Sequence, residues 1–257
     1  QFPERLQHLL TSSKPGLDTE SIVYPQYETR GDLKKAVELF CTWLEQKVKE
    51  NEEEINSHDR KGDVWVCLIG HSMGGILAAD TILKYASQND PTPPKIIGLF
   101  AFDTPYYGVH EKVFSKATLE RAAGAALVGG AVYSQKDNVS NGVEWLGSHL
   151  EYVGVLWKKE ELKQRVENFV KVPDITFHCF YTQIPTTAPY SSPRTFIVLP
   201  PPEMLTYFSP TICTSKDEID AHIYMFDPEF NSYYYDLGHV SARRIIDMVD
   251  KWEETNN

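Results

Sequence analysis

The chain has 257 residues, of which 42% are hydrophobic and 24% are charged, so it is long enough to bury the core of one large α/β domain. Its formal net charge of −11 at pH 7 and its pI of about 5.2 argue against a nucleic-acid partner, because phosphate binding requires clustered Lys and Arg. We therefore expect a single acidic domain over residues 1–257, whose charge mainly favours solubility.

The four cysteines are far apart and lack the spacing of metal ligands. Two of them, Cys67 and Cys179, lie in apolar, strand-like runs, where a free thiol behaves as a small hydrophobic group. This usage favours a reducing compartment, and we expect a cytoplasmic protein. No charged-then-apolar leader and no apolar run of about 18 residues is visible, so the sequence predicts neither a signal peptide nor a membrane span.

The first quarter of the chain predicts two helices and a strand. Residues 2–10 have helical spacing of apolar residues, and residues 21–28 alternate like a strand. Residues 32–49 place apolar side chains on one helical face, with Asp32 as the expected N-cap. The acidic segment 50–63 that follows is expected to be a solvated loop.

Buried strands and helices alternate in the rest of the chain. The run VWVCLIG (64–70) is continuously apolar, as in a parallel strand covered on both faces, and a helical pattern follows it. Further strands are predicted over 95–102, 175–181 and 195–200, and a closing amphipathic helix over 240–252. This alternation indicates an α/β fold, a mostly parallel sheet with helices on both faces.

Residues 109–172 break this alternation and are too long for an ordinary connection. They include a small, apolar segment, AAGAALVGGAVY (122–133), then a polar stretch, then further helical patterns. We interpret 109–172 as a helical insertion over the sheet. Segment 122–133 is interpreted as a close-packed buried helix or as a mobile lid and peripheral membrane contact for an apolar substrate; it is too short to span a bilayer.

Residues 70–74, Gly-His-Ser-Met-Gly, match the G-x-S-x-G pattern of a nucleophile elbow. That pattern requires a strand, a tight turn and a helix, and all three are predicted here. We expect Gly70 and Gly74 to let the helix and the adjacent strands approach closely. The Ser72 hydroxyl would then lie at the carboxyl end of the sheet, beside a helix N-terminus that favours developing negative charge. The alternative is a glycine-rich turn with a solvated serine.

A serine nucleophile needs a base, normally histidine, and an acid that orients the histidine. The expected chain order is serine, acid, histidine, and the histidines after Ser72 are His110, His149, His178, His222 and His239. His178 is expected to be a packed core residue within a strand. His222 is the favoured base, in a loop that could reach back over the sheet, and His239, beside the closing helix, is the alternative.

No carboxylate follows the strand at 175–181, where the acid of such a site is usually found. Asp103 ends the strand at 95–102, one strand beyond the nucleophile at the same edge of the sheet, and is the first candidate. Asp217 and Asp220 are the alternatives, although Asp220 is only two residues from His222. Asp103 could equally be a turn residue that caps the following segment through its own side chain.

Several segments together resemble one family. GHSMGGILAADT, IIGLFAFDTPYYGVH, the Ala/Gly insertion, WLGSHLEYVGVLW and DEIDAHIYMFDPEFNSYYYDLG are similar to fungal lipase-like serine esterases. More distantly they resemble the α/β-hydrolases that include GPI-inositol deacylases and triacylglycerol lipases. The resemblance covers nearly the whole chain and implies an α/β-hydrolase fold and ester hydrolysis without a cofactor. Carried over by position, it implies Ser72 as nucleophile, His222 as base and Asp103 as acid.

The chain also departs from that family at its start. Such hydrolases begin with strands before the segment FPERLQ, and one of them ends in a loop that supplies half of the oxyanion hole. We expect these N-terminal strands to be missing here, including a central one between segments 21–28 and 64–70. Two hypotheses follow. The first is a serine hydrolase of carboxylic esters, with lipid esters as the expected substrates and the Met73 N–H as an oxyanion donor. The second is a non-catalytic binding or scaffold module.

Overall fold

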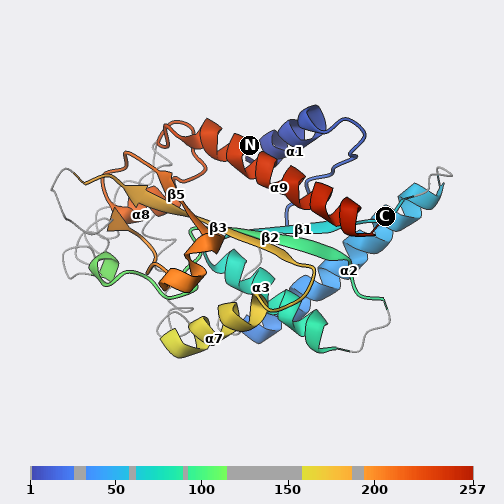
Figure 1. The fold of residues 1–257 in the computed structure, drawn as a ribbon, viewed down its shortest axis with the longest axis horizontal. Coiled ribbons are helices and arrows are strands. Elements are labelled where there is room, and N and C mark those ends of the chain that lie inside the picture. Colours follow the sequence, from blue (N-terminus) through green and yellow to red (C-terminus); the bar gives the residue numbers. More distant parts are fainter. Residues whose placement is uncertain are drawn as a thin grey trace, which may run out of the picture.

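The computed structural model describes residues 2–25, 33–57, 62–88, 92–114, 158–186 and 194–256. Their centre is a mostly parallel sheet with helices on both faces (Figure 1). The strands are β1 (Val66–His71), β2 (Ile96–Phe102), β3 (Thr176–Ile184), β4 (Arg194–Thr195) and β5 (Phe208–Ile212). The predicted α/β fold is confirmed.

Three strand pairs in the sheet are parallel and one is antiparallel. β2 lies between β1 and β3 and is parallel to both. β5 is parallel to β3, while the two residues of β4 pair in the antiparallel sense with the end of β3. Every residue of β2 is buried, as expected for a central strand covered on both faces.

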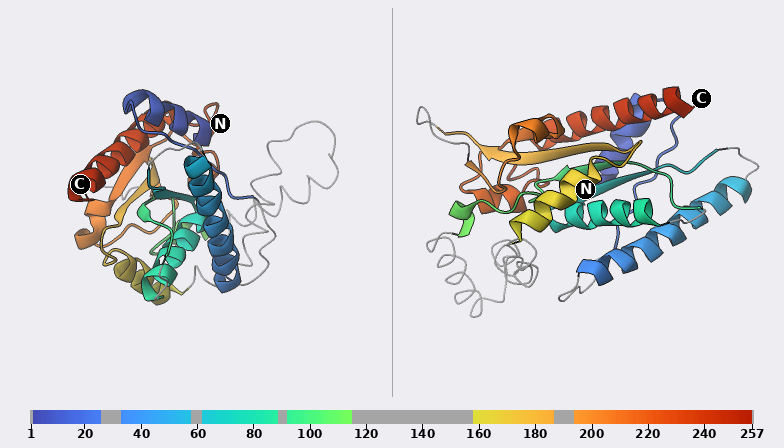
Figure 2. Two further views of the ribbon diagram at one scale, coloured as in Figure 1. Left: turned by 90° about the vertical axis from the view of Figure 1, so that its right-hand side faces the viewer. Right: turned by 60° about the horizontal axis from the view of Figure 1, so that its bottom comes forward.

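One face of the sheet is covered by α1 (Phe2–Ser13) and α9 (Tyr234–Asn256), which lie side by side in all three views (Figures 1 and 2). Phe2, Leu6 and Leu10 recur at helical spacing and form the buried stripe of α1. They pack with apolar residues of α9 and with Phe102 and Phe180 of the sheet in one hydrophobic cluster. This cluster lies beneath the strand ends that carry the candidate site.

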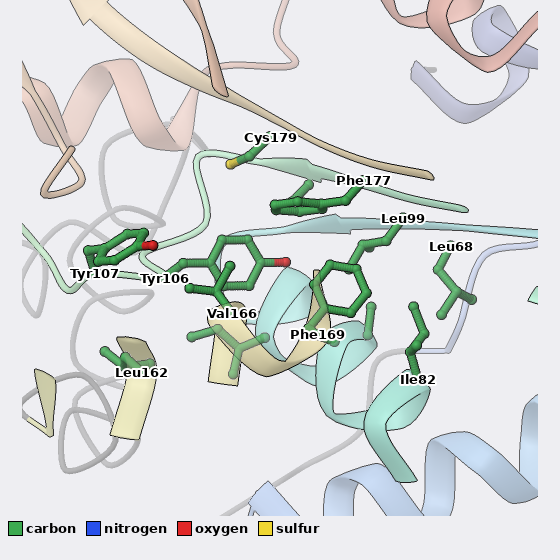
Figure 3. Packing of buried hydrophobic residues seen from close by; sticks show 14 of the residues in the cluster. Leu68, Ile82, Leu99, Tyr106, Tyr107, Leu162, Val166, Phe169, Phe177 and Cys179 are labelled. Carbon is green, nitrogen blue, oxygen red and sulfur yellow. The ribbon is translucent and has the colours of Figure 1, made fainter. Parts of the chain in front are cut away.

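The opposite face is covered by α2 (Leu33–Ser57), α3 (Met73–Ser87) and α7 (Lys159–Phe169). Figure 3 shows the side chains of α7, Leu162, Val166 and Phe169, lying against Tyr106 and the sheet. The Tyr106 hydroxyl donates to the Gly75 carbonyl at 2.9 Å. Because Gly75 lies in the first turn of α3, this bond ties the segment after β2 to the start of the helix that follows Ser72.

Two predictions near the chain's beginning, the strand at 21–28 and the loop at 50–63, differ from the structure where it is described. Residues 21–25 form no strand, and Val23 is 65% exposed, so their alternation does not mark a half-buried strand. The predicted N-cap Asp32 and residues 26–32 lie outside the described residues. The loop expected at 50–63 is wrong for 50–57, which continue α2. Glutamates are good helix formers, and Lys47–Glu50 and Lys49–Glu53 pair along this helix at 2.6 Å and 3.8 Å.

The strand predicted at 195–200 is also largely wrong. Only Arg194–Thr195 join the sheet. The next residues pair with the segment after β2 instead: the Val198 N–H donates to the Gly108 carbonyl at 2.9 Å, and the His110 N–H donates to the Phe196 carbonyl at 2.8 Å. This pairing holds Phe196 beside the carboxyl end of β2.

The helical insertion predicted at 109–172 lies mostly outside the described residues. Its described ends contain the 3₁₀ helix η1 (Glu111–Phe114) and α7. Segment 122–133, the predicted buried helix, lid or membrane contact, is not among the residues that the structure describes. Within the described ranges no helix combines the length and apolar character needed to cross a bilayer.

Among the described strands β1 pairs with β2 alone, and Ile69 on β1 is 46% exposed. The described residues do not test the expectation about further strands, which stays a prediction from the sequence.

Candidate functional site

The register of the parallel strands brings the predicted nucleophile and acid to one edge of the sheet. His71, the last residue of β1, pairs with Phe102, the last residue of β2. The next residues continue this pattern, since the Ser72 N–H donates to the Phe102 carbonyl at 2.9 Å and the Asp103 N–H donates to the Phe180 carbonyl at 2.6 Å. Ser72 and Asp103 therefore lie on neighbouring strand ends, as the sequence predicted.

Ser72 adopts a strained backbone conformation between β1 and α3, with φ 54° and ψ −126°. Non-glycine residues rarely adopt positive φ, so the surrounding contacts must hold the turn in place. The Ser72 side chain makes no capping hydrogen bond to α3, and the residue is only 6% exposed. This geometry disagrees with a solvated serine in an ordinary glycine-rich turn.

Two glycines make the tight turn possible. A Cβ at Gly70 would lie 2.5 Å from backbone atoms of Gly74 and Gly75, and a Cβ at Gly75 would lie 2.2 Å from the Thr104 Oγ1 atom. Apart from its chain neighbours and the backbone of its own helix, no described atom lies within 4 Å of a Cβ built at Gly74. The expected crowding is therefore found at Gly70 but not at Gly74, because the close approach between α3 and the segment after β2 occurs one residue later.

His222 lies on a short helix, α8 (Glu218–Ile223), and not in the loop that the sequence predicted. Asp217 is the N-cap of this helix, and its side chain accepts from the Asp220 N–H at 2.9 Å. Arg194 of β4 makes two hydrogen bonds to the Glu218 carboxylate, at 2.9 Å and 3.1 Å. The cap stabilises the first turn of α8, and the bidentate pair ties this turn to β4.

The structure places the His222 ring between Ser72 and Asp103. Nδ1 of His222 lies 2.7 Å from Oδ2 of Asp103, and Nε2 lies 3.0 Å from Oγ of Ser72. A carboxylate only accepts, so Nδ1 carries the proton, and Nε2 of the neutral ring accepts from the Ser72 hydroxyl. The three side chains come from three separate elements and form one continuous hydrogen-bonded chain.

Asp103 has a defined orientation of its own. The Thr182 N–H donates to Oδ1 at 2.9 Å, and the Thr182 hydroxyl donates to Oδ2 at 2.8 Å. Asp103 and His222 are both fully buried. The carboxylate is therefore held by residues of β3 and does not cap the turn that follows it, which was the alternative interpretation of this residue.

Phe196 covers the His222 ring. Their centroids are 3.7 Å apart and their planes differ by 15°. Phe196 is itself buried, and its position follows from the pairing of residues 196–198 with 108–110. This stacking restricts rotation of the imidazole and keeps water away from one side of it.

The rival residues lie elsewhere. His239 is on the exposed side of α9, and Asp217 is engaged as the cap of α8. His178 is buried in β3, where desolvation and the nearby Arg244 lower its pKa to about 4, in agreement with the expected core role. His149 is not among the described residues.

The oxyanion donor predicted at Met73 is the first residue of α3. The first N–H groups of a helix lack intrahelical acceptors and point toward its N-terminal end. The Met73 N–H therefore belongs to a set of donors that lies beside Ser72.

Sequence reasoning missed Thr182, Phe196 and Arg194. Thr182 follows from register, because it is the residue of β3 that lies opposite the turn after β2, but the register was not predicted. The helix signal around Asp217, an N-cap residue followed by acidic residues in the first turn, could have indicated α8. Within the described ranges, no group of three or more His, Cys, Asp or Glu side chains is arranged to hold a metal ion.

Comparison with known proteins gives little additional information. No protein-family model matches the chain, and a search of curated proteins finds no match. Among solved structures, the chain is similar to phospholipase PlaB from Legionella pneumophila in complex with thio-NAD, with a TM-score of 0.36 and 18% identity. The match covers 71% of this chain and 35% of that one, so this chain spans about a third of its length.

Proposed function

We propose that this protein is a serine hydrolase that cleaves carboxylic esters through an acyl-enzyme on Ser72. The observation that carries the proposal is the continuous chain of hydrogen bonds from Ser72 through His222 to Asp103. A serine, a histidine and a carboxylate in this order are the parts that acyl transfer requires. The strained, buried turn at Ser72 supports the same interpretation.

In the first half of the reaction, the Ser72 Oγ attacks the ester carbonyl carbon while its proton passes to Nε2 of His222. Asp103 stabilises the resulting imidazolium through Nδ1–H. The carbonyl oxygen becomes an oxyanion, for which the Met73 N–H is the proposed donor. When the C–O bond to the alcohol breaks, His222 returns the proton to the leaving oxygen, and the acyl group remains on Ser72.

In the second half, water attacks the acyl carbon and gives its proton to His222 Nε2. The bond to Ser72 Oγ then breaks, and the proton returns to that oxygen. The carboxylic acid leaves, and the site returns to its starting state.

For the substrate class we propose lipid or other acyl esters. The resemblance of the chain to fungal lipase-like esterases supports this choice. The aromatic rings around the base, Phe196 against His222 and Phe226 against His71, agree with an apolar site. A peripheral membrane contact through residues 122–133 and a cytoplasmic location stay predictions from the sequence.

An activity-based probe tests the proposal. In a fluorophosphonate, Ser72 Oγ would bond to phosphorus, fluoride would leave, and His222 would accept the proton. We expect stoichiometric labelling of the parent protein at Ser72 and no labelling of Ser72→Ala. Ser209→Ala is the matched control, because Ser209 also lies 3.0 Å from a histidine Nε2, and it should label like the parent.

Turnover of p-nitrophenyl butyrate separates this proposal from the second hypothesis, a non-catalytic binding or scaffold module. A hydrolase turns over the ester at a rate that Ser72→Ala abolishes. If the parent neither labels nor turns over any p-nitrophenyl ester of short or medium chain length, the hydrolase proposal is wrong for this chain.

A further inference from the structure

His71 contacts the backbone of the candidate base. Its Nε2 lies 3.1 Å from the His222 carbonyl oxygen, across 151 residues of sequence. A carbonyl oxygen only accepts, so Nε2 of His71 is the donor and carries a proton. The two rings also lie close together, with centroids 4.7 Å apart and planes inclined by 32°.

The His71 contact is made at the C-terminal end of α8, whereas the Asp217 cap stabilises the N-terminal end. α8 has only six residues, and His222 is in its last turn, where carbonyl groups lack intrahelical donors. Asp217 and Arg194 hold the first turn. His71 supplies a donor to the last turn, at the carbonyl of His222, the residue whose ring contacts Ser72.

The His71 side chain is itself held in place. Phe226 packs edge-on against its ring, with centroids 5.3 Å apart. Phe226 in turn contacts Phe102 and Phe2, at 5.2 Å and 4.5 Å. The donor therefore projects from a packed aromatic cluster and not from a freely rotating side chain.

We propose that His71 is a positioning residue, whose Nε2–H fixes the His222 backbone at the distance from Ser72 that proton transfer requires. This inference rests on the proposed function. His71 directly precedes Ser72 and ends β1, so one short stretch of backbone holds the nucleophile and, through the His71 side chain, the base. Residues 70–74 would then supply both the nucleophile and a residue that positions the base.

Small errors in this distance have large effects on rate. Displacement of a reacting group by about 1 Å can lower a rate about 100-fold. Substrate or probe binding does not use the His71 donor, so its loss should lower the rate of the chemical step and leave the binding constant nearly unchanged.

The test measures fluorophosphonate labelling over a range of probe concentrations, which separates the maximal inactivation rate from the probe's apparent binding constant. His71→Phe keeps an aromatic ring against Phe226 but removes the donor. We expect its maximal rate to fall about 10- to 100-fold with an unchanged binding constant. His71→Gln places an amide donor at a similar distance from the backbone, and its rate should be within about 3-fold of the parent. His239→Phe, on the exposed side of α9, is the matched control and should label like the parent.

Melting curves of each variant show whether it is folded. If His71→Phe is not folded, His71→Leu replaces it as the variant without a donor. Equal maximal rates for the parent and the folded variant without a donor would overturn the inference, as would a His71→Gln variant as slow as that variant. In either case labelling of the parent at Ser72 would still support the proposed function. A parent that is not labelled would overturn both.

Discussion

Two serine–histidine pairs among the described residues have the same contact distance but different surroundings. His222 Nε2 lies 3.0 Å from the Ser72 hydroxyl, and His178 Nε2 lies 3.0 Å from the Ser209 hydroxyl. Both histidines are almost completely buried. The contact between serine and histidine therefore does not by itself distinguish a candidate nucleophile from a structural pair.

The difference lies in the group that faces each imidazole. His222 has the Asp103 carboxylate at 2.7 Å from its Nδ1, which favours a cationic ring during proton transfer. His178 has Arg244 nearby, and burial together with this positive charge lowers its pKa to about 4. In the proposed mechanism the first histidine accepts a proton from serine, while the second is neutral near pH 7 and serves as a hydrogen-bonding core residue.

The two serines differ as well. Ser72 lies in a strained turn with φ 54° at the end of β1, whereas Ser209 is an ordinary residue of β5 that pairs with Phe180. A serine in a regular strand has its neighbours at normal spacing and no helix N-terminus beside it. The comparison indicates that the orienting acid and the strained turn, more than the serine–histidine contact, define the site.

Asp103→Asn should have the largest effect, because it removes the carboxylate that distinguishes the two pairs. An amide in place of the carboxylate can donate to Nδ1, which favours the wrong tautomer of His222 and leaves Nε2 protonated. We expect a fall of about 10³- to 10⁴-fold in kcat for p-nitrophenyl butyrate and in the fluorophosphonate labelling rate. His178→Gln is the control at the second pair and should leave both rates unchanged. An Asp103→Asn variant within 10-fold of the parent would contradict the role of Asp103.

The parts of the site that could be predicted from sequence are those at the ends of parallel strands. Ser72 and Asp103 each follow a continuous apolar run, and such runs end at one edge of a sheet whatever their register. Thr182 and Phe196 could not be predicted, because their positions depend on the register of β3 and on the pairing of 196–198 with 108–110.

The fold, like the site, could be predicted from the sequence only in part. Long periodic segments such as α9 and fully apolar runs such as β2 were predicted, because their burial pattern is set by local sequence. β5 was missed: it has only five residues and contains Pro210, and proline in a short run argues against a strand unless the strand lies at an edge. Residues 21–25 show the opposite error, since alternation alone does not create a neighbouring strand.

The strained turn at Ser72 can be tested separately from its partners. Gly70→Ala would place a Cβ 2.5 Å from the backbone of Gly74 and Gly75, which no side-chain rotation can relieve. We expect a loss of about 2–4 kcal/mol in the free energy of unfolding and slower labelling of Ser72. Urea unfolding and probe labelling would measure the two effects.

Gly74→Ala is the matched control within the same motif. Its Cβ meets no described atom within 4 Å, and alanine favours a helix over glycine by about 1 kcal/mol. We expect unchanged or slightly higher stability. Equal destabilisation by the two substitutions would show that the close approach at Gly70 does not hold the turn.

The second pair is expected to make the stability of the protein depend on pH. The unfolded chain protonates His178 near its ordinary pKa of 6.5, whereas the folded protein does so only near 4. Between these values the unfolded state binds more protons, so stability rises with pH. The contribution of His178 is therefore complete above about pH 6.5 and is lost as pH falls toward 4, with a loss of about 2 kcal/mol by pH 5.

His178→Gln isolates this contribution, because glutamine does not titrate and its amide can still bond to the Ser209 hydroxyl. Urea unfolding of both proteins at about pH 7.5 and about pH 5 gives four free energies, and the other titrating groups cancel in the comparison. The parent should lose about 2 kcal/mol more than the variant on acidification. If the two proteins lose the same free energy of unfolding, His178 titrates normally in the fold. The contrast between His178 and the candidate base His222 would then have to rest on the Asp103 carboxylate alone.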